Sequence, residues 1–202
     1  MSIEFMRLDD LISDDGYRVP AYLLTPPHAT VGAVLVHGYG GCKEQMLGLA
    51  ARLADSGFAA LCLDLRGHGE HPAPLGGGLL QDLEAGLARL RPARRTVAIG
   101  HSLGGRLALM SSADVVVAIS PALPSRPSEE GRQMLLQFGS TAVRAASPYQ
   151  ILQLLQEMGP VPPSRQPRLV IHARGDIPSL IEGITTLASS QPGALQIGRA
   201  HV

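Results

Sequence analysis

Apolar residues recur along this chain with two different spacings. Short runs of continuous or alternating apolar residues, typical of strands, separate longer stretches in which apolar residues recur every three or four positions, typical of amphipathic helices. The short runs predict strands at residues 3–8, 17–25, 31–36, 59–63, 95–99, 114–119, 168–172 and 194–197. The longer stretches predict helices at residues 43–56, 79–90, 105–110 and 178–190. Strand and helix therefore alternate from residue 31 onwards.

This alternation predicts the class of fold. Continuously apolar strands are typical of a parallel sheet that is buried on both faces. Short strand–helix–strand units place helices on both of those faces. The first two strands, with a turn at Asp14-Asp15-Gly16 between them, predict a hairpin. We therefore expect an α/β protein with a mostly parallel sheet of about eight strands, and a ligand site at the carboxyl ends of those strands.

The regular alternation breaks after Ser120. Prolines cluster on both sides of two modest amphipathic stretches, at residues 129–138 and 148–158. Proline-bounded helices inserted between two strands predict a small helical cap over the carboxyl edge of the sheet. We place this cap at residues 121–165 of a single domain that spans residues 1–202. An ordinary crossover helix with a long loop is the alternative.

Composition narrows the classes of function. The net charge is zero, which argues against nucleic acid or an anionic membrane as the main partner. No apolar run approaches the ~20 residues of a membrane span, and acidic residues stand near the N-terminus where a signal peptide needs basic ones. The expected location is therefore the cytoplasm. Cys42 and Cys62 are expected to be free thiols, and no clustering of ligand residues predicts a metal or cofactor site.

The segment 100–104, with the sequence G-H-S-L-G, follows the predicted strand at 95–99 and precedes a helix. A sharp turn from strand to helix lifts the Ser102 hydroxyl clear of the sheet edge, and the helix directs its first N–H groups towards it. We expect a strained backbone at Ser102 and no room for a side chain at Gly100 or Gly104. A capping serine in a glycine-rich turn is the alternative interpretation.

A serine hydroxyl is a poor nucleophile at neutral pH and needs a base, which a carboxylate orients. Asp176 follows the strand at 168–172, and His201 follows the last predicted strand, so both are expected at the same edge of the sheet as Ser102. Of the seven histidines, His201 alone stands after the final strand, with Gly198 allowing a tight turn. The predicted triad is therefore Ser102, Asp176 and His201.

Two other aspartates are weaker candidates for the acid. Asp64 precedes Arg66 and is expected to hold its own loop through a salt bridge and backbone N–H bonds. Asp114 opens a strand at the opposite end of the sheet. An oxyanion hole also needs two backbone N–H groups. We expect one from Leu103 and the other from the glycine-rich loop at residues 37–41, at Tyr39.

In this order, the motifs resemble those of the α/β-hydrolase family. The matching segments are residues 37–41, 64–69, 100–104, 172–176 and 198–201. The resemblance implies an α/β-hydrolase fold and a hydrolase of the carboxylesterase or lipase-like kind that works through an acyl-enzyme on Ser102. Ala173 departs from the family, which usually has glycine there. The sequence also ends one residue after His201, where the family normally adds a last helix, so the protein is either trimmed or incomplete.

The expected activity is cleavage of small carboxylic esters, with short acyl chains favoured because the predicted cap is small. The expected partner is a small-molecule ester, and the oligomeric state is open. Thioesterase, acyltransferase, peptidase and lactonase activities use the same machinery and stay open. A non-catalytic ligand-binding protein on the same fold is a further alternative.

Overall fold

The computed structural model describes residues 2–123, 127–191 and 195–200. In chain order its elements are β1 (Glu4–Leu8), β2 (Ala21–Thr25), β3 (Val31–Val36), η1 (Lys43–Met46), α1 (Leu47–Asp55), β4 (Phe58–Leu63), α2 (Leu79–Leu90), β5 (Arg95–His101), α3 (Leu103–Met110), β6 (Val115–Ile119), α4 (Glu129–Ala142), α5 (Gln150–Glu157), β7 (Arg168–Ala173), α6 (Pro178–Ser190) and β8 (Leu195–Ala200). No helix in these described ranges is long and apolar enough to cross a membrane.

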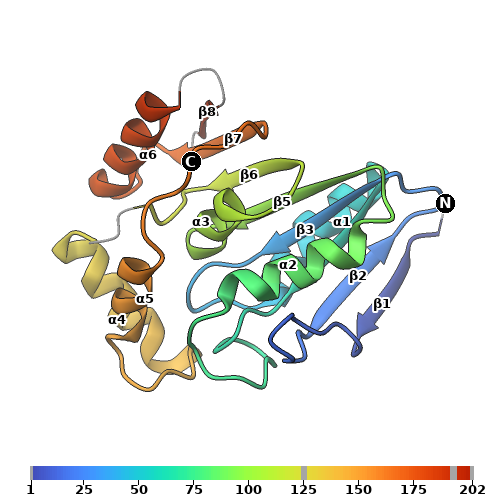
Figure 1. The fold of residues 1–202 in the computed structure, drawn as a ribbon, viewed down its shortest axis with the longest axis horizontal. Helices are drawn as coiled ribbons and strands as arrows, with labels where there is room; N and C mark the ends of the chain where they lie inside the picture. The colour runs from blue at the N-terminus through green and yellow to red at the C-terminus, as the bar shows by residue number, and fades with distance from the viewer. Residues whose placement is uncertain (1, 124–126, 192–194, 201–202) are drawn as a thin grey trace.

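The strands form a single eight-stranded sheet in the order β1-β2-β4-β3-β5-β6-β7-β8. Among these strands only β2 runs antiparallel to its neighbours, β1 and β4, and the pairs from β4 to β8 are parallel. The expected mostly parallel sheet of about eight strands is therefore confirmed. The carboxyl ends of the parallel strands meet at one edge, away from the N-terminus of the chain (Figure 1).

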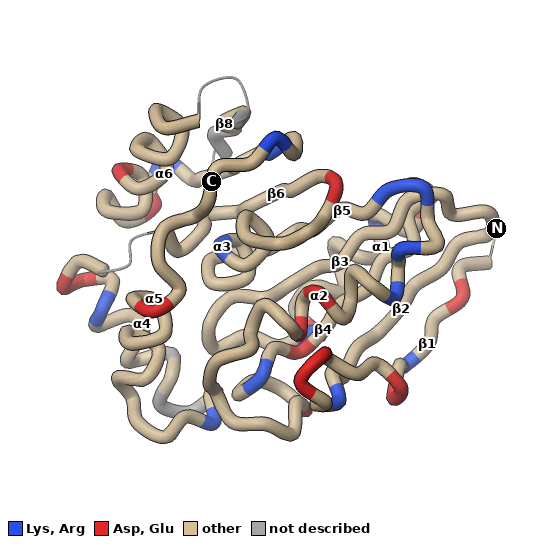
Figure 2. The backbone as a smooth tube through the Cα atoms, viewed as in Figure 1, with Lys and Arg blue, Asp and Glu red and all other residues tan. Residues whose placement is uncertain are grey.

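Helices cover both faces of this sheet because successive side chains of a strand point to opposite sides. Val34 and Val36 of β3 belong to the larger apolar core, together with leucines of α2 and α3. Ala33 and Leu35 belong to the smaller core, with Ala50 of α1. The continuous apolar sequence of β3 is thus buried on its two sides by different helices. Figure 2 shows charged positions mainly around the periphery, whereas β3 and β6 contain none.

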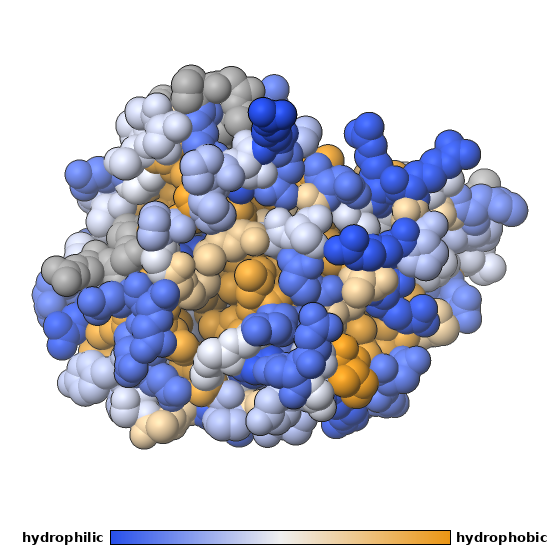
Figure 3. Space-filling view, viewed as in Figure 1, coloured by the Kyte–Doolittle hydropathy of each residue, from blue (hydrophilic) through white to orange (hydrophobic). Residues whose placement is uncertain are grey.

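The helices α4 and α5 lie between β6 and β7 in sequence and beside the carboxyl ends of the strands in space (Figure 1). Backbone hydrogen bonds join this segment to the loop after β4: the Leu75 N–H donates to the Arg144 carbonyl at 2.7 Å, and the Arg144 N–H donates to the Gly67 carbonyl at 2.8 Å. Apolar side chains gather over the region between α3 and α5 on the face seen in Figure 3. The segment therefore packs against the edge of the sheet where a ligand site was expected.

Two sequence-based expectations differ from the structure. β1 and β2 pair antiparallel, as the predicted hairpin requires. The turn at Asp14-Asp15-Gly16, however, does not join them directly; it lies inside a longer connection, next to an isolated bridge between Ile12 and Arg18. The last strand does not end before Gly198. It continues to Ala200, with Gly198 paired to Ile171 of β7, so Gly198 makes no tight turn. The reason is that β7 still offers a partner for pairing at these positions.

Candidate active site

Ser102 occupies the sharp turn between β5 and α3. Its backbone lies at φ 50° and ψ −110°, a conformation that non-glycine residues rarely adopt. A Cβ at Gly104 would lie 2.5 Å from the Val36 carbonyl oxygen, and a Cβ at Gly100 would collide with the Gly104 backbone. The two glycines therefore let the new helix pass directly over β3 and β5, and the strain and close packing expected around Ser102 are present.

Backbone hydrogen bonds connect the ends of three neighbouring strands. The Ser102 N–H donates to the Ile119 carbonyl of β6 at 2.9 Å, and the Ser120 N–H donates to the Ile171 carbonyl of β7 at 2.7 Å. Ser120, like Ser102, has a positive φ, of 43°. A serine with positive φ therefore follows both β5 and β6, and its N–H binds a carbonyl of the neighbouring strand. These hydrogen bonds fix the positions of the ends of β5, β6 and β7 relative to one another.

Asp176 lies in the loop between β7 and α6. Its Oδ2 atom accepts a hydrogen bond from Ser120 Oγ at 2.6 Å and another from the Ala173 N–H at 2.9 Å. Asp176 and Ser102 both line a cavity of about 560 Å³. Two members of the predicted triad are therefore brought to one cavity. His201 lies outside the described residues; the preceding residue, Ala200, pairs with Ala173 at the end of β7.

The glycine-rich loop after β3 lies against the serine. A Cβ at Gly38 would lie 3.3 Å from Ser102 Cβ and 2.9 Å from His101 Nδ1, so only glycine allows this approach. Tyr39 follows in the same loop and lines the cavity, and Leu103 is the first residue of α3. The two backbone segments expected to supply oxyanion N–H groups thus both lie next to Ser102.

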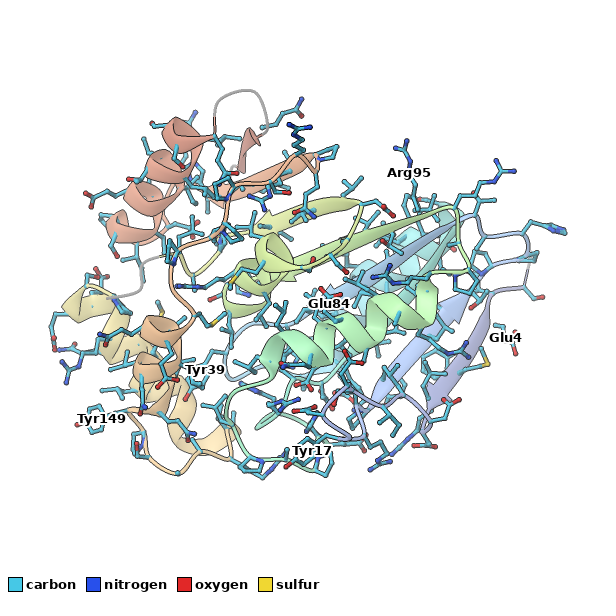
Figure 4. The ribbon with its side chains drawn as sticks, viewed as in Figure 1. Glu4, Tyr17, Tyr39, Glu84, Arg95 and Tyr149 are labelled. Carbon is cyan, nitrogen blue, oxygen red and sulfur yellow. The ribbon has the colours of Figure 1, made fainter. Side chains whose placement is uncertain are left out.

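The Tyr39 side chain turns towards the α4–α5 segment, as its label in Figure 4 allows the reader to follow. Tyr39 is 9% exposed, and its ring stands edge-on to the His68 ring, with the centroids 5.5 Å apart. Its hydroxyl group lies so close to Gly139 of α4 that a Cβ there would collide with it. Burial raises the pKa of the Tyr39 phenol. The side chain therefore anchors the loop and leaves the backbone of residues 38–41 facing the cavity.

The cavity walls are chemically mixed. The polar atoms come from the backbone of residues 38–41 and from Gln45, His101, Ser120 and Asp176. The remaining walls are apolar and come from α4 and from the start of α6: Met134, Leu135, Ile177 and Leu180. None of the described lining residues is Lys or Arg. Desolvation lowers the pKa of the His101 imidazole, against the opposing effect of the Asp176 carboxylate.

The histidines His37 and His68 have structural positions near the loops. Nδ1 of His37 lies 2.8 Å from the Gly38 carbonyl, and Nε2 accepts the Leu65 N–H at 3.2 Å, which together require the neutral tautomer protonated at Nδ1. Burial lowers its pKa. Burial, together with the neighbouring His37, lowers the pKa of His68 to about 4. Both imidazoles therefore hold the loops after β3 and β4 in their neutral forms.

The two rival aspartates have structural partners, as expected from the sequence. Asp64 accepts hydrogen bonds from the Lys43 ammonium at 2.8 Å and from the N–H groups of Lys43 and Glu70 at 2.8 and 2.9 Å. Asp114 accepts the N–H and hydroxyl of Thr96 at the opposite end of the sheet. Neither carboxylate lines the cavity that contains Ser102.

Arg106 of α3 was not recognised from the sequence as important. Its side chain is fully buried, and its guanidinium donates to the backbone carbonyls of Ala122 (2.9 Å), Leu123 (3.2 Å) and Leu155 (3.1 Å), and also to that of Gly159. One side chain on the helix that follows Ser102 therefore binds both ends of the α4–α5 segment. The sequence feature that could have indicated its importance is a charged residue inside a helix whose other residues are apolar or glycine.

Ser120 was not among the candidate site residues expected from the sequence. The structure brings its hydroxyl to Asp176 through the pairing of β6 with β7. No pattern of residues near position 120 indicates this contact, since the two residues are 56 positions apart.

Comparison with known proteins identifies the family and the type of fold. The sequence matches the family model described as "Alpha/beta hydrolase family" over residues 33–189. No curated protein matches the sequence significantly. An esterase of Pyrococcus furiosus is similar in structure, with a TM-score of 0.72 and 18% identity over 98% of this chain and 83% of that one.

Two further solved structures are similar over a comparable length. An esterase of Pyrobaculum calidifontis has a TM-score of 0.72 and 20% identity, over 99% of this chain and 75% of that one. An alpha/beta hydrolase of Penicillium sp. sh18 has a TM-score of 0.70 and 14% identity, over 100% of this chain and 90% of that one. At these identities the likeness shows the fold, and the activity has to be argued from the site.

Proposed function

The chain belongs to the alpha/beta hydrolase family, and we propose that it is a serine hydrolase that cleaves small carboxylic esters through an acyl-enzyme on Ser102. The observation that carries the proposal is the strained turn at Ser102, φ 50°, facing the same cavity as Asp176. Backbone strain of this kind costs about 1–3 kcal/mol and persists at sites where geometry matters for chemistry. In the proposal Asp176 is the acid and His201, outside the described residues, is the base.

In the first half of the proposed reaction, Ser102 Oγ attacks the ester carbonyl carbon while His201 takes the hydroxyl proton. The carbonyl oxygen becomes an oxyanion, which the N–H groups of Tyr39 and Leu103 stabilise. Loss of one such donor typically lowers turnover by a factor of roughly 10²–10³. The C–O bond to the alcohol then breaks, His201 returns the proton to the leaving oxygen, and the acyl group stays on Ser102.

In the second half, water replaces the alcohol. His201 takes a proton from the water as its oxygen attacks the acyl carbon, and the same N–H groups hold the new oxyanion. The bond between the acyl carbon and Ser102 Oγ breaks, and Oγ recovers the proton. The acid product leaves and the enzyme returns to its starting state.

The walls of the cavity support an uncharged substrate of modest size. A cavity of about 560 Å³ shared by the acyl and alcohol parts of an ester has room for short chains. Apolar side chains of α4 and α6 line the part away from Ser102, and no lysine or arginine among the described lining residues is available for an anionic group. We propose that residues 121–165 act as a small cap and that short acyl chains are preferred.

A fluorophosphonate probe tests the nucleophile directly. We expect the folded protein to be labelled at Ser102, and S102A to remain unlabelled with an unchanged far-ultraviolet circular dichroism spectrum. Failure of the folded wild type to react would favour a non-catalytic binding protein on the same fold.

A series of p-nitrophenyl esters of rising acyl length tests the substrate class. We expect turnover to be best on short chains and to fall by a factor on the order of 10⁶ in S102A. Best turnover on long-chain esters would contradict the small cap. Higher kcat/KM on matched thioesters or amides than on esters would assign a thioesterase or a peptidase on the same machinery.

A further inference from the structure

The hydroxyl of Ser120 lies at hydrogen-bond distance from the Asp176 carboxylate, with 2.6 Å between Oγ and Oδ2. This is the short distance expected of an O–H donor on an ionised carboxylate, the stronger class of hydrogen bond. Ser120 also lines the cavity that contains Ser102. Its hydroxyl is therefore at the site and contacts the residue proposed as the acid.

The pattern of bonds on Asp176 distinguishes its two oxygen atoms. Ser120 Oγ and the Ala173 N–H both donate to Oδ2. Within the described residues Oδ1 accepts no hydrogen bond. A carboxylate oxygen can accept up to two hydrogen bonds, so Oδ2 is fully used and Oδ1 is left for another donor. The carboxylate is thus held by one oxygen and presents the other.

The backbone of Ser120 gives a second, independent indication. Its φ of 43° is unfavourable for a residue with a Cβ, and glycine would adopt it without strain. The Ser120 N–H donates to the Ile171 carbonyl at 2.7 Å, which fixes the residue between β6 and β7. A serine in a position that favours glycine indicates that its hydroxyl group has a role.

We propose that Ser120 is a positioning residue, which holds Oδ2 of Asp176 so that Oδ1 is directed to the catalytic imidazole. The inference rests on the proposed function, because it takes Asp176 as the acid and Ser102 as the nucleophile. Without the Ser120 hydroxyl, the Ala173 N–H alone holds Oδ2, so the carboxylate turns more easily about its χ2 bond. The imidazolium formed during attack on the ester is then less well stabilised.

Three substitutions test this role. S120A removes the hydroxyl and keeps the backbone strain, whereas S120G removes the hydroxyl and relieves the strain. S120N supplies an amide donor to Asp176 and tolerates positive φ. T96V is the matched control, because it removes a hydroxyl–aspartate hydrogen bond, from Thr96 to Asp114 at 3.0 Å, at the opposite end of the sheet.

The measurements are kcat, KM and the rate of fluorophosphonate labelling of Ser102, each as a function of pH. For S120A and S120G we expect kcat and the labelling rate to fall by about 10- to 100-fold, the loss typical of a misplaced catalytic group, with KM changed less than about twofold. We expect the acid limb of the pH profile to move to lower pH, because a poorly placed carboxylate stabilises the imidazolium less. S120N should recover most of the rate, and T96V should match wild type.

Among the described residues, the titratable groups that share a cavity with Asp176 are His101 and Tyr39 on one side and Arg174 and Glu182 on the other, near α6. Any difference between the acid limbs of H101Q and wild type measures the contribution of His101 titration to the pH profile. A purely structural role for Ser120 predicts a different result: S120G would fold at least as well as wild type, with the same labelling rate and the same acid limb. That result would overturn the proposal.

The labelling reaction separates the two proposals. If wild type labels at Ser102 but hydrolyses no ester, the substrate class is wrong, and the labelling rates of the Ser120 variants still decide the role of Ser120. If folded wild type does not label, both proposals fail together. Circular dichroism and thermal midpoints of all variants show whether a lost rate reflects lost folding.

Discussion

The Lys43 ammonium group lies 2.8 Å from Oδ2 of Asp64, and both side chains are fully buried. The same ammonium contacts Glu70 and Glu44 at 2.9 Å. Burial lowers the pKa of Lys43, but hydrogen bonds with these three carboxylates outweigh it and raise the pKa above its ordinary value. The pair joins the segment after the glycine-rich loop at residues 37–41 to the loop after β4, so it supports the wall of the candidate site.

We expect K43M to destabilise the protein by about 3–5 kcal/mol, because it leaves a buried carboxylate without its counter-charge. The double variant K43M/D64N should recover part of this loss by removing that charge. E44Q is the control: Glu44 is 46% exposed, so its contribution should stay below about 1 kcal/mol. Guanidinium unfolding curves measure all three, and a K43M loss no larger than that of E44Q would contradict the expectation.

The lowered pKa of the buried His68 imidazole should make the protein less stable in mild acid. This pKa falls from 6.5 to about 4 on folding, so between these values the unfolded chain binds more protons than the folded one. The His68 contribution to the free energy of unfolding is therefore fully present above pH 6.5. It is lost as the pH falls towards 4, which lowers the free energy of unfolding by an amount on the order of 3 kcal/mol. Unfolding free energies measured from pH 7.5 to 4.5 should show this decline.

We expect H68N to flatten that decline, because asparagine can still donate to the Arg66 carbonyl that His68 Nδ1 contacts at 3.0 Å and does not titrate. His37 is also buried, so part of the pH dependence should persist. H28N is the matched control, since His28 is exposed and its φ of 61° suits asparagine. An equal effect of H68N and H28N would show that His68 is not the source.

Substitution of Gly104 tests the close approach of α3 to β3. A Cβ in G104A would lie 2.5 Å from the Val36 carbonyl oxygen and 2.6 Å from that of His37, both backbone atoms within the packed core. We expect a loss of about 3 kcal/mol or more, together with loss of Ser102 labelling, because the turn has to move. The measurements are thermal unfolding and fluorophosphonate labelling.

G48A provides the comparison for that substitution. Gly48 is exposed in α1, and a Cβ there meets no atom within 4 Å. Alanine in this helix should therefore stabilise the protein by about 0.5–1 kcal/mol and leave labelling unchanged. Similar losses in G104A and G48A would show that crowding at the Ser102 turn is not the cause.

The hydrogen bonds of the Arg106 guanidinium join α3 to the α4–α5 segment, so their removal should loosen that segment. R106M keeps the length of the side chain but leaves the carbonyls of Ala122, Leu123, Leu155 and Gly159 without this donor. We expect a loss of about 3 kcal/mol or more and faster proteolytic cleavage within residues 121–165. R106K, which keeps the charge with fewer donors, should give an intermediate loss. Unchanged cleavage in R106M would contradict the link.

Much of the secondary structure could be predicted because it depends on local periodicity. The strand at 31–36 and the helices at 79–90 and 178–190 have the predicted bounds. The connection between β1 and β2 could not be predicted, because Asp15 within it accepts a hydrogen bond of 2.6 Å from Arg66, 51 residues away. That contact holds the turn against the loop after β4, and only the folded chain brings the two together.

In the candidate site, too, some features could be predicted from the local sequence and others could not. The turn at Ser102 and the need for glycine on both sides follow from the steric limits of a few neighbouring residues, which any such sequence must satisfy. The role of Asp64 as a loop-holding carboxylate was also correctly predicted. Its ion-pair partner is Lys43, however, and Arg66 pairs instead with Asp82 and Asp15.

By itself, the sequence determined the succession of strands and helices along the chain, and with it the class of sheet, and the strained serine. Each follows from patterns of residues that are close along the chain. Only the tertiary structure decided which partner each buried polar group takes: Ser120 with Asp176, Arg106 with the α4–α5 carbonyls, and Lys43 with Asp64. The physical reason is that a buried polar group must be paired. Which partner is within reach depends on how distant segments align once the sheet has formed.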